Sequence, residues 1–128
     1  MKKVVIPSLY LFLFLITFIV NACTKLASDF DANSSVEEII KNANEAFDKR
    51  DYTRAAEIYL KVEELYPYSD SSREALIKAI NSYHIGSQFN ELRKTSKKYL
   101  DLYPKDKNAS FAKYMVGMSY FEQIIDVE

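Results

Sequence analysis

Apolar residues recur at three- and four-residue spacing along most of the chain after residue 35, with polar residues between them. This period predicts amphipathic helices. The first helix ends near Lys49, and its apolar face consists of Val36, Ile39, Ile40, Ala43, Ala46 and Phe47. A second follows Asp51 and ends before Pro67, because the residue preceding a proline disfavours helical geometry. Its face consists of Ala55, Ala56, Tyr59, Leu60, Val62 and Leu65. The pattern predicts a helical hairpin.

The hairpin pattern returns after 37 residues, so that Leu65-Tyr66-Pro67 recurs as Leu102-Tyr103-Pro104. The repeats are 36–68, 73–105 and 110–128, and the third contains only a first helix. Such hairpins bury their apolar faces by stacking on neighbours. We therefore expect an all-α fold, a helical-hairpin solenoid of about two and a half repeats.

Helix start signals accompany the repeats. Ser35 and Ser71 each precede a glutamate by three residues, which is the spacing of a capping box. Asn108 is placed to cap the helix of the third repeat. Composition agrees with a helical fold, since 2 Gly and 3 Pro are too few turn formers for an all-β sandwich or barrel.

The first 22 residues predict a secretory signal peptide. Lys2 and Lys3 precede an apolar run at 9–20, and small Ala22 stands directly before Cys23, the only cysteine. An uncleaved membrane anchor is the alternative, but the apolar stretch of 17 residues at 4–20 is at the lower edge of what spans a bilayer. We favour cleavage.

The segment Val20-Asn21-Ala22-Cys23 resembles the bacterial lipobox, whose cysteine is diacylated and becomes the new N-terminus. Several acyl chains would fix the chain to a membrane surface. By resemblance to lipoprotein sorting in diderm bacteria, where Asp after the cysteine retains a lipoprotein in the inner membrane, Thr24 permits transfer to the outer membrane. We therefore expect a lipid-anchored protein on the periplasmic face of the outer membrane. Residues 23–35 then form a lipidated tether, whose part at 24–34 reaches up to ~35 Å when extended.

Loss of the signal peptide leaves 15 basic residues against the 18 acidic ones. That balance gives no electrostatic footprint for nucleic acid. Arg93, Lys94, Lys97 and Lys98 form a basic run on the second helix of repeat 2, which we interpret as a solvated face rather than a lipid-binding patch. Glu63 and Glu64 receive the same interpretation.

The repeat spacing resembles the tetratricopeptide repeat. Ala43 and Gly117 stand at the small-residue position of that family's first helix, Tyr83 at its aromatic position, and Pro67 and Pro104 at its closing proline. Departures occur at Ala46, Ile80, Leu92 and Ser96. The period exceeds the usual repeat of about 34 residues, and the extra length falls in the expected loops at 68–72 and 105–109.

A lipobox followed by Leu65-Tyr66-Pro67-Tyr68-Ser69 and by Gly117-Met-Ser-Tyr-Phe-Glu-Gln-Ile124 resembles the BamD (ComL) family of outer-membrane protein assembly lipoproteins. The resemblance covers about residues 20 to 128. It implies a non-enzymatic scaffold of the β-barrel assembly machinery that helps barrel proteins assemble and insert. The implied partners are unfolded outer-membrane proteins, BamA and the other subunits, with BamA contacted largely through later repeats than these.

Members of that family have more repeats, so we expect this chain to be a fragment, a split gene or a decayed product. The first helix of repeat 3 would then have no second helix to cover its apolar face. That face consists of Tyr114, Met115, Met118, Tyr120, Phe121, Ile124 and Ile125.

The first helices of tetratricopeptide repeats line a concave groove. Its candidate residues here are Ile40, Asn44, Phe47, Ile77, Asn81, His84, Tyr114, Met118 and Phe121. Aromatic pockets flanked by amides one repeat apart suit an extended peptide, and we hypothesise that this peptide is the aromatic-ended C-terminal strand of nascent outer-membrane proteins. Alternatively, Ile40, Ile77 and much of the aromatic stripe belong to the core between repeats.

No nucleophile with a base, phosphate loop or pair of catalytic carboxylates is recognisable, and His84 lacks companions for a metal site. We therefore expect no enzyme activity and no cofactor beyond the covalent lipid. Two alternatives stay open. One is a tetratricopeptide lipoprotein of cell-envelope division or peptidoglycan maintenance that binds peptide partners, and the other is an envelope enzyme subunit with its catalytic cluster beyond Glu128.

Overall fold

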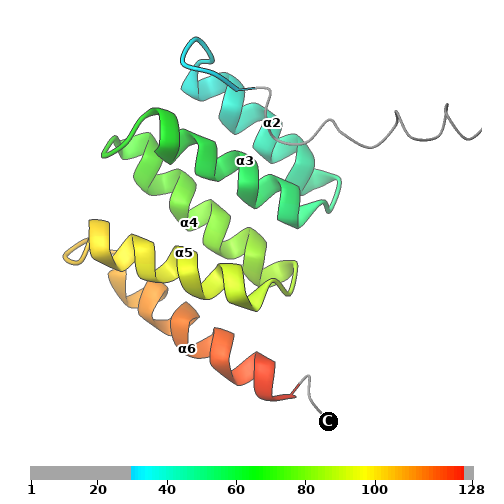
Figure 1. The fold of residues 1–128 in the computed structure, drawn as a ribbon, viewed down its shortest axis with the longest axis vertical. Coiled ribbons are helices and arrows are strands. Elements are labelled where there is room, and N and C mark those ends of the chain that lie inside the picture. Colours follow the sequence, from blue (N-terminus) through cyan, green and yellow to red (C-terminus); the bar gives the residue numbers. More distant parts are fainter. Residues whose placement is uncertain (1–29, 126–128) are drawn as a thin grey trace, which may run out of the picture.

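The computed structural model describes residues 30–125, which form five α-helices and no strand. These are α2 (Val36–Asp48), α3 (Tyr52–Leu65), α4 (Asp70–Ile85), α5 (Phe89–Leu102) and α6 (Ala109–Ile125). The helices stack in chain order as two hairpins and a fifth helix (Figure 1). The helices α2, α4 and α6 also contact one another in series. The prediction of an all-α helical-hairpin solenoid is confirmed.

The signal peptide at 1–22, Cys23 and the tether as far as residue 29 lie outside the described residues. Within 30–125, no helix is both long and apolar enough to cross a membrane.

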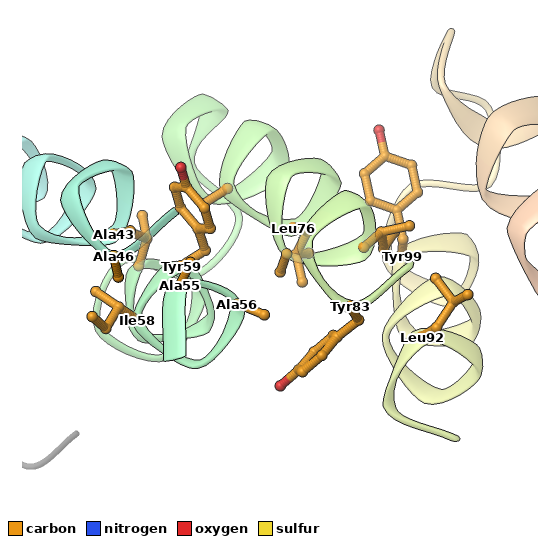
Figure 2. Packing of buried hydrophobic residues seen from close by; sticks show 14 of the residues in the cluster. Ala43, Ala46, Ala55, Ala56, Ile58, Tyr59, Leu76, Tyr83, Leu92 and Tyr99 are labelled. Carbon is orange, nitrogen blue, oxygen red and sulfur yellow. The ribbon is translucent and has the colours of Figure 1, made fainter. Parts of the chain in front are cut away.

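Small side chains let the helices pack closely. Ala43, Ala55 and Ala56 are fully buried, and larger residues such as Leu76 and Leu92 belong to the same core cluster (Figure 2). Burial of each such leucine contributes about 2 kcal/mol to folding. The core therefore runs continuously through both hairpins, as a stacked repeat requires.

The two turns inside the hairpins have the same backbone geometry. Arg50 and Ser87, one repeat apart, both adopt left-handed conformations, with φ of 63° and 56°. Their amides donate to the carbonyls of Phe47 and His84 at the ends of α2 and α4. Gly86 precedes Ser87, and a Cβ added to it would lie only 3.1 Å from the Tyr52 Cβ. Here the absence of a side chain allows the end of α4 to approach the start of α3.

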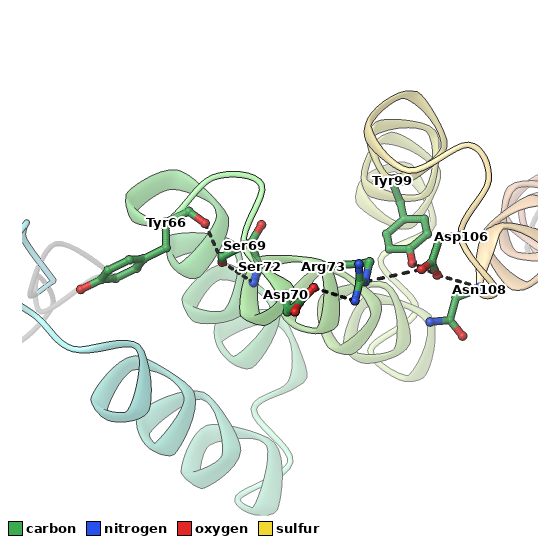
Figure 3. A network of polar contacts seen from close by, with 8 residues as sticks. All are labelled: Tyr66, Ser69, Asp70, Ser72, Arg73, Tyr99, Asp106 and Asn108. Carbon is green, nitrogen blue, oxygen red and sulfur yellow. Dashed lines mark hydrogen bonds and ion pairs between the residues drawn. The ribbon is translucent and has the colours of Figure 1, made fainter.

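The turns between repeats differ from the sequence-based expectation at one cap. Ser35 caps α2 as predicted, since its hydroxyl accepts from the Glu38 amide at 3.2 Å. The cap of α4, however, is Ser69, whose hydroxyl accepts from the Ser72 amide at 3.0 Å (Figure 3). The prediction of a cap at Ser71 is therefore wrong, and 70–72 belong to α4 rather than to a loop. At the third repeat, α6 begins directly after Asn108, as expected.

The residues just before α2 are docked on the first hairpin. Phe30 packs against the core, and Ser34 is buried. A turn closes between Asp31 and Ser34, and the Tyr66 hydroxyl donates to the Ser34 carbonyl at 2.6 Å. The ordered domain therefore includes residues 30–35, which the sequence pattern assigned to the tether.

Helix α6 is covered on one side. Ala112 and Met115 are buried, whereas Tyr114, Phe121 and Ile124 are exposed. The prediction that Met115 belongs to the uncovered face is therefore wrong, because this side chain joins the core cluster. Tyr120 on α6 is 49% exposed, whereas Tyr83, the equivalent residue of the preceding repeat, is only 4% exposed.

The basic run on α5 is only partly a solvated face. Lys94, Lys97 and Lys98 are exposed as predicted, but Arg93 reaches α6, where it donates to the Gln123 side chain at 2.8 Å and lies 4.3 Å from the Tyr120 ring. Glu63 also departs from the prediction, because it pairs with Lys98 and is only 14% exposed.

Candidate peptide-binding groove

A pocket of about 240 Å³ opens between α2 and α4, and we call it the aromatic pocket. It is lined by Asn44, Phe47, Tyr59, Lys78, Asn81 and Ser82. Asn44 and Asn81 are equivalent positions of successive repeats, so the 37-residue period brings both amides to one hollow. Phe47 is half-buried, and its ring packs edge-on against Tyr52 with centroids 5.1 Å apart. Three of the nine predicted groove residues thus come together here.

The Tyr59 side chain determines how Asn44 can bind a ligand. Its hydroxyl donates to the Asn44 Oδ1 at 2.5 Å, so the Asn44 amide nitrogen remains available as a donor. Burial is the main cause that raises the pKa of Tyr59, followed by the charge of Asp48, and the phenol therefore stays protonated as the donor. The pocket consequently presents amide groups beside aromatic carbon.

A second pocket, of about 310 Å³, adjoins the first along α4, and we call it the basic pocket. It is lined by Arg73, Glu74, Ile77, Lys78, Lys107 and Asn108. Lys78 lines both pockets, and its ammonium lies 5.5 Å from the Tyr59 ring centroid. The predicted groove residue Ile77 is therefore adjacent to the aromatic pocket but outside it.

A polar network around Asp106 holds the loop that carries Lys107 and Asn108, two residues that line the basic pocket (Figure 3). The Asp106 carboxylate accepts from the Tyr99 hydroxyl at 2.5 Å and from the Asn108 amide at 2.8 Å. It also lies 3.5 Å from Arg73, which pairs with Asp70 at 2.8 Å. These contacts fix the α5–α6 loop against the first turns of α4.

The same network shifts two acid–base equilibria. The Tyr99 hydrogen bond, then the Asn108 amide, holds the pKa of the Asp106 carboxyl below its usual range. Burial, and then the hydrogen bond to Asp106, raises the pKa of Tyr99 to about 12. Asp106 is thus charged and Tyr99 protonated at neutral pH.

The remaining predicted groove residues line neither pocket. Ile40 is half-buried and packs against the core, as the alternative interpretation held, and His84 is half-buried near the end of α4. On α6, Met118 is half-buried while Tyr114 and Phe121 are exposed. Their part in a binding surface stays a prediction.

Sequence reasoning missed Tyr59, Lys78 and Ser82. Tyr59 belongs to a second helix, which the groove argument did not consider. Lys78 and Ser82 are four residues apart on α4, the spacing that places them on one helical face, so periodicity could have indicated them.

Within residues 30–125, no group of three or more His, Cys, Asp or Glu side chains is placed to hold a metal ion. What the described residues do provide is a pair of adjoining pockets on stacked first helices. Repeated helical hairpins with such a surface define the class of tetratricopeptide-type solenoids, whose surfaces serve binding.

Comparison with known proteins gives the family. Residues 32–128 match the YfiO family, described as "Outer membrane lipoprotein", and the chain belongs to it. It is 29% identical to the outer membrane protein assembly factor BamD of Caulobacter vibrioides over 92 residues, which cover 72% of this chain and 30% of that protein. No solved structure matches.

Two further relatives carry the same name. The BamD of Neisseria gonorrhoeae is 26% identical over 80% of this chain and 40% of its own length, and that of Rickettsia prowazekii is 27% identical over 76% and 40%. The chain thus spans 30 to 40% of the length of these relatives. The resemblance to the BamD family is confirmed, and the alternative of a division or peptidoglycan lipoprotein is not favoured.

Proposed function

We propose that this chain is a lipid-anchored, non-enzymatic scaffold that binds unfolded outer-membrane proteins and helps them assemble. The observation that carries the proposal is the convergence of Asn44 and Asn81 on a pocket with aromatic walls. Amide donors and acceptors can pair with the backbone of an extended peptide, while an apolar pocket takes one of its side chains. The names of the relatives, all assembly factors of outer membrane proteins, support this assignment.

The proposed anchor is a diacyl lipid on Cys23, with the domain on the periplasmic face of the outer membrane. Support comes from the lipobox-like segment before Cys23 and from the family's description as an outer membrane lipoprotein. Mass spectrometry of the mature chain tests this directly. We expect a cleaved N-terminus with the added mass of the lipid, and a Cys23→Ala variant that leaves the membrane fraction. An unmodified Cys23 in a processed chain would contradict the anchor.

The proposed partners are unfolded outer-membrane proteins, BamA and the other assembly-machinery subunits. Capture from envelope extracts with the full chain, and with a version extended by further repeats of a relative, separates these contacts. Recovery of unfolded barrel proteins by both, and of BamA mainly by the extended version, would agree with the proposal. Recovery of neither class by either version would contradict it.

Peptide binding tests the groove itself. The probe is a short synthetic peptide of alternating apolar and polar residues that ends in Phe, titrated into the full chain in detergent. We expect Asn81→Ala to weaken binding about fivefold, the effect of one lost hydrogen bond of about 1 kcal/mol. Asn42→Ala is the matched control, since Asn42 is an asparagine of α2 that lines neither pocket of the groove. Equal affinities for wild type and Asn81→Ala would contradict the groove.

A further inference from the structure

The exposed face of α6 is centred on Gly117 and carries several aromatic side chains. We infer that this face binds a second copy of the chain, with the two α6 helices antiparallel about a two-fold axis at Gly117. The inference goes beyond the proposed function, because it assigns two of the predicted groove residues, Tyr114 and Phe121, to a contact between copies.

The exposed face has a regular spacing. Counted from Gly117, the residues three, four and seven positions away in both directions are exposed, and these spacings place helical side chains on one face. Ala112, Met115 and Ser119 lie on the other side of α6 and are buried. The four large hydrophobic side chains of the exposed face are between 49% and 71% exposed. The whole set consists of Ser110, Lys113, Tyr114, Gly117, Tyr120, Phe121 and Ile124.

A two-fold axis makes this face complementary to itself. Residues seven positions apart lie on the same flank of a helix, and an antiparallel two-fold pair brings the two members of such a set together across the contact. On one flank, Tyr114 therefore meets Phe121 of the second copy, which makes an aromatic pair. On the other flank, Lys113 meets Tyr120 of the second copy and places an ammonium group beside a ring. Arg93 covers one side of that ring, at 4.3 Å from its centroid, and leaves the other side for this contact.

Gly117 allows the two helices to approach closely. A Cβ built on this glycine would meet no atom within 4 Å, so the position faces open space. Two backbones that cross with a glycine on both sides can approach to roughly 8 Å, the lower end of the interaxial distances between packed helices. At that separation the aromatic side chains on both flanks reach the second copy.

The area of the face limits the affinity of the contact. Three aromatic side chains of about 200 Å² each, roughly half exposed, together with Ile124 give roughly 400 Å² per copy. Stable complexes bury about 800 Å² per partner, so we expect a weak dimer with a dissociation constant of about 100 μM. Copies held on one membrane by the lipid proposed above would share a thin layer, which raises their effective concentration.

Sedimentation velocity of the mature chain with Cys23→Ala, over a range of concentrations, measures the dimer without the lipid. We expect self-association that Phe121→Glu weakens by about tenfold or more, because the contact would bury two carboxylates. Tyr68→Glu is the matched control, since Tyr68 is 77% exposed in the turn between α3 and α4 and should leave self-association unchanged. A version extended by further repeats of a relative, whose next helix would cover α6, should be monomeric.

Cysteine cross-linking tests the orientation in the same Cys23→Ala background. Gly117→Cys places both thiols at the two-fold axis, where oxidation should form a disulfide between copies. Ile124→Cys should not, because an antiparallel pair separates its two thiols by about 14 residues, or ~21 Å along the helices. A chain that stays monomeric at all concentrations, or a dimer unaffected by Phe121→Glu, would overturn the inference. So would a dimer that persists in the extended version, or equal cross-linking at both positions. None of these measurements uses a peptide ligand or the lipid, so such a result would leave the proposed function intact.

Discussion

Tyr66 and Tyr103 occupy equivalent positions one repeat apart, but their hydroxyls differ in one contact. The Tyr66 hydroxyl donates to the Ser34 carbonyl at 2.6 Å, across 32 residues of chain. The Tyr103 hydroxyl is buried and has no hydrogen-bond partner within residues 30–125. One tyrosine therefore fastens the segment before α2 to the turn between repeats, and the other carries an unmatched polar group.

This difference predicts opposite effects of the same substitution. Tyr66→Phe removes a hydrogen bond and leaves the Ser34 carbonyl without its donor, so we expect the free energy of unfolding to fall by about 1 kcal/mol. Tyr103→Phe removes an unmatched buried hydroxyl and should be neutral or slightly stabilising. Denaturant unfolding followed by circular dichroism measures both, and equal losses in the two variants would contradict the assignment.

A second prediction concerns the left-handed residues of the two hairpin turns. Ser87→Gly relieves the steric cost of a left-handed L-residue, roughly 1 kcal/mol, against which glycine adds some unfolded-state entropy. We expect a net gain of about 0.5 kcal/mol in the free energy of unfolding, and the same from Arg50→Gly. Gly86→Ala should act in the opposite sense, because its Cβ would press on Tyr52. A stabilised Gly86→Ala variant would contradict the close approach of Gly86 to Tyr52, and a destabilised Ser87→Gly variant would contradict the left-handed conformation of Ser87.

Arg93 should hold α6 in place. Arg93→Ala loses the hydrogen bond to Gln123 and the stacking on Tyr120, together about 1 kcal/mol. Since α6 is covered on one side only, we expect amide hydrogen exchange in α6 to accelerate about fivefold while α3 is unaffected. Lys97→Ala on the same helix is the control, and equal acceleration in both variants would remove Arg93 from this role.

The lowered pKa of Asp106 predicts a pH dependence of stability. A carboxyl whose pKa is lower in the folded state stabilises the fold above its unfolded pKa of about 4, and this contribution is lost as the pH falls through the folded pKa. The stability gap between wild type and Asp106→Asn should thus be widest at neutral pH and narrow below about pH 4. Urea unfolding across this range measures the gap. A gap that stays constant with pH would contradict the linkage.

Much of the fold follows from the sequence because the apolar period and the Tyr-Pro pairs locate the helices and their ends. The error at Ser71 has a local cause, since residues 69–72 offer three serines and an aspartate, any of which can cap a helix. The packing decides between them, because the chain is already helical where Ser72 is buried, and Ser69 is left as the residue that caps α4. Met115 was misplaced because a helical stripe does not reveal which edge the neighbouring helix covers.

The groove was predictable in part for the same reason. The repeat period alone places Asn44 and Asn81 on the same side of the stacked first helices, but it does not show whether a pocket lies between them. Tyr59 reaches the pocket from a different helix, and only the hairpin geometry shows that its hydroxyl meets Asn44. Similarly, Lys107 and Asn108 join the basic pocket through a loop whose path depends on the contacts of Asp106.

The packing of Phe30 on the first hairpin also limits how far the domain can move away from a membrane to which Cys23 is anchored. If Cys23 carries the proposed lipid, only seven peptide units separate the bilayer from the packed domain, and whatever their conformation they span at most ~25 Å. The groove would then stay in a thin layer of periplasm next to the membrane, and the unfolded proteins that we propose as its partners would meet it there.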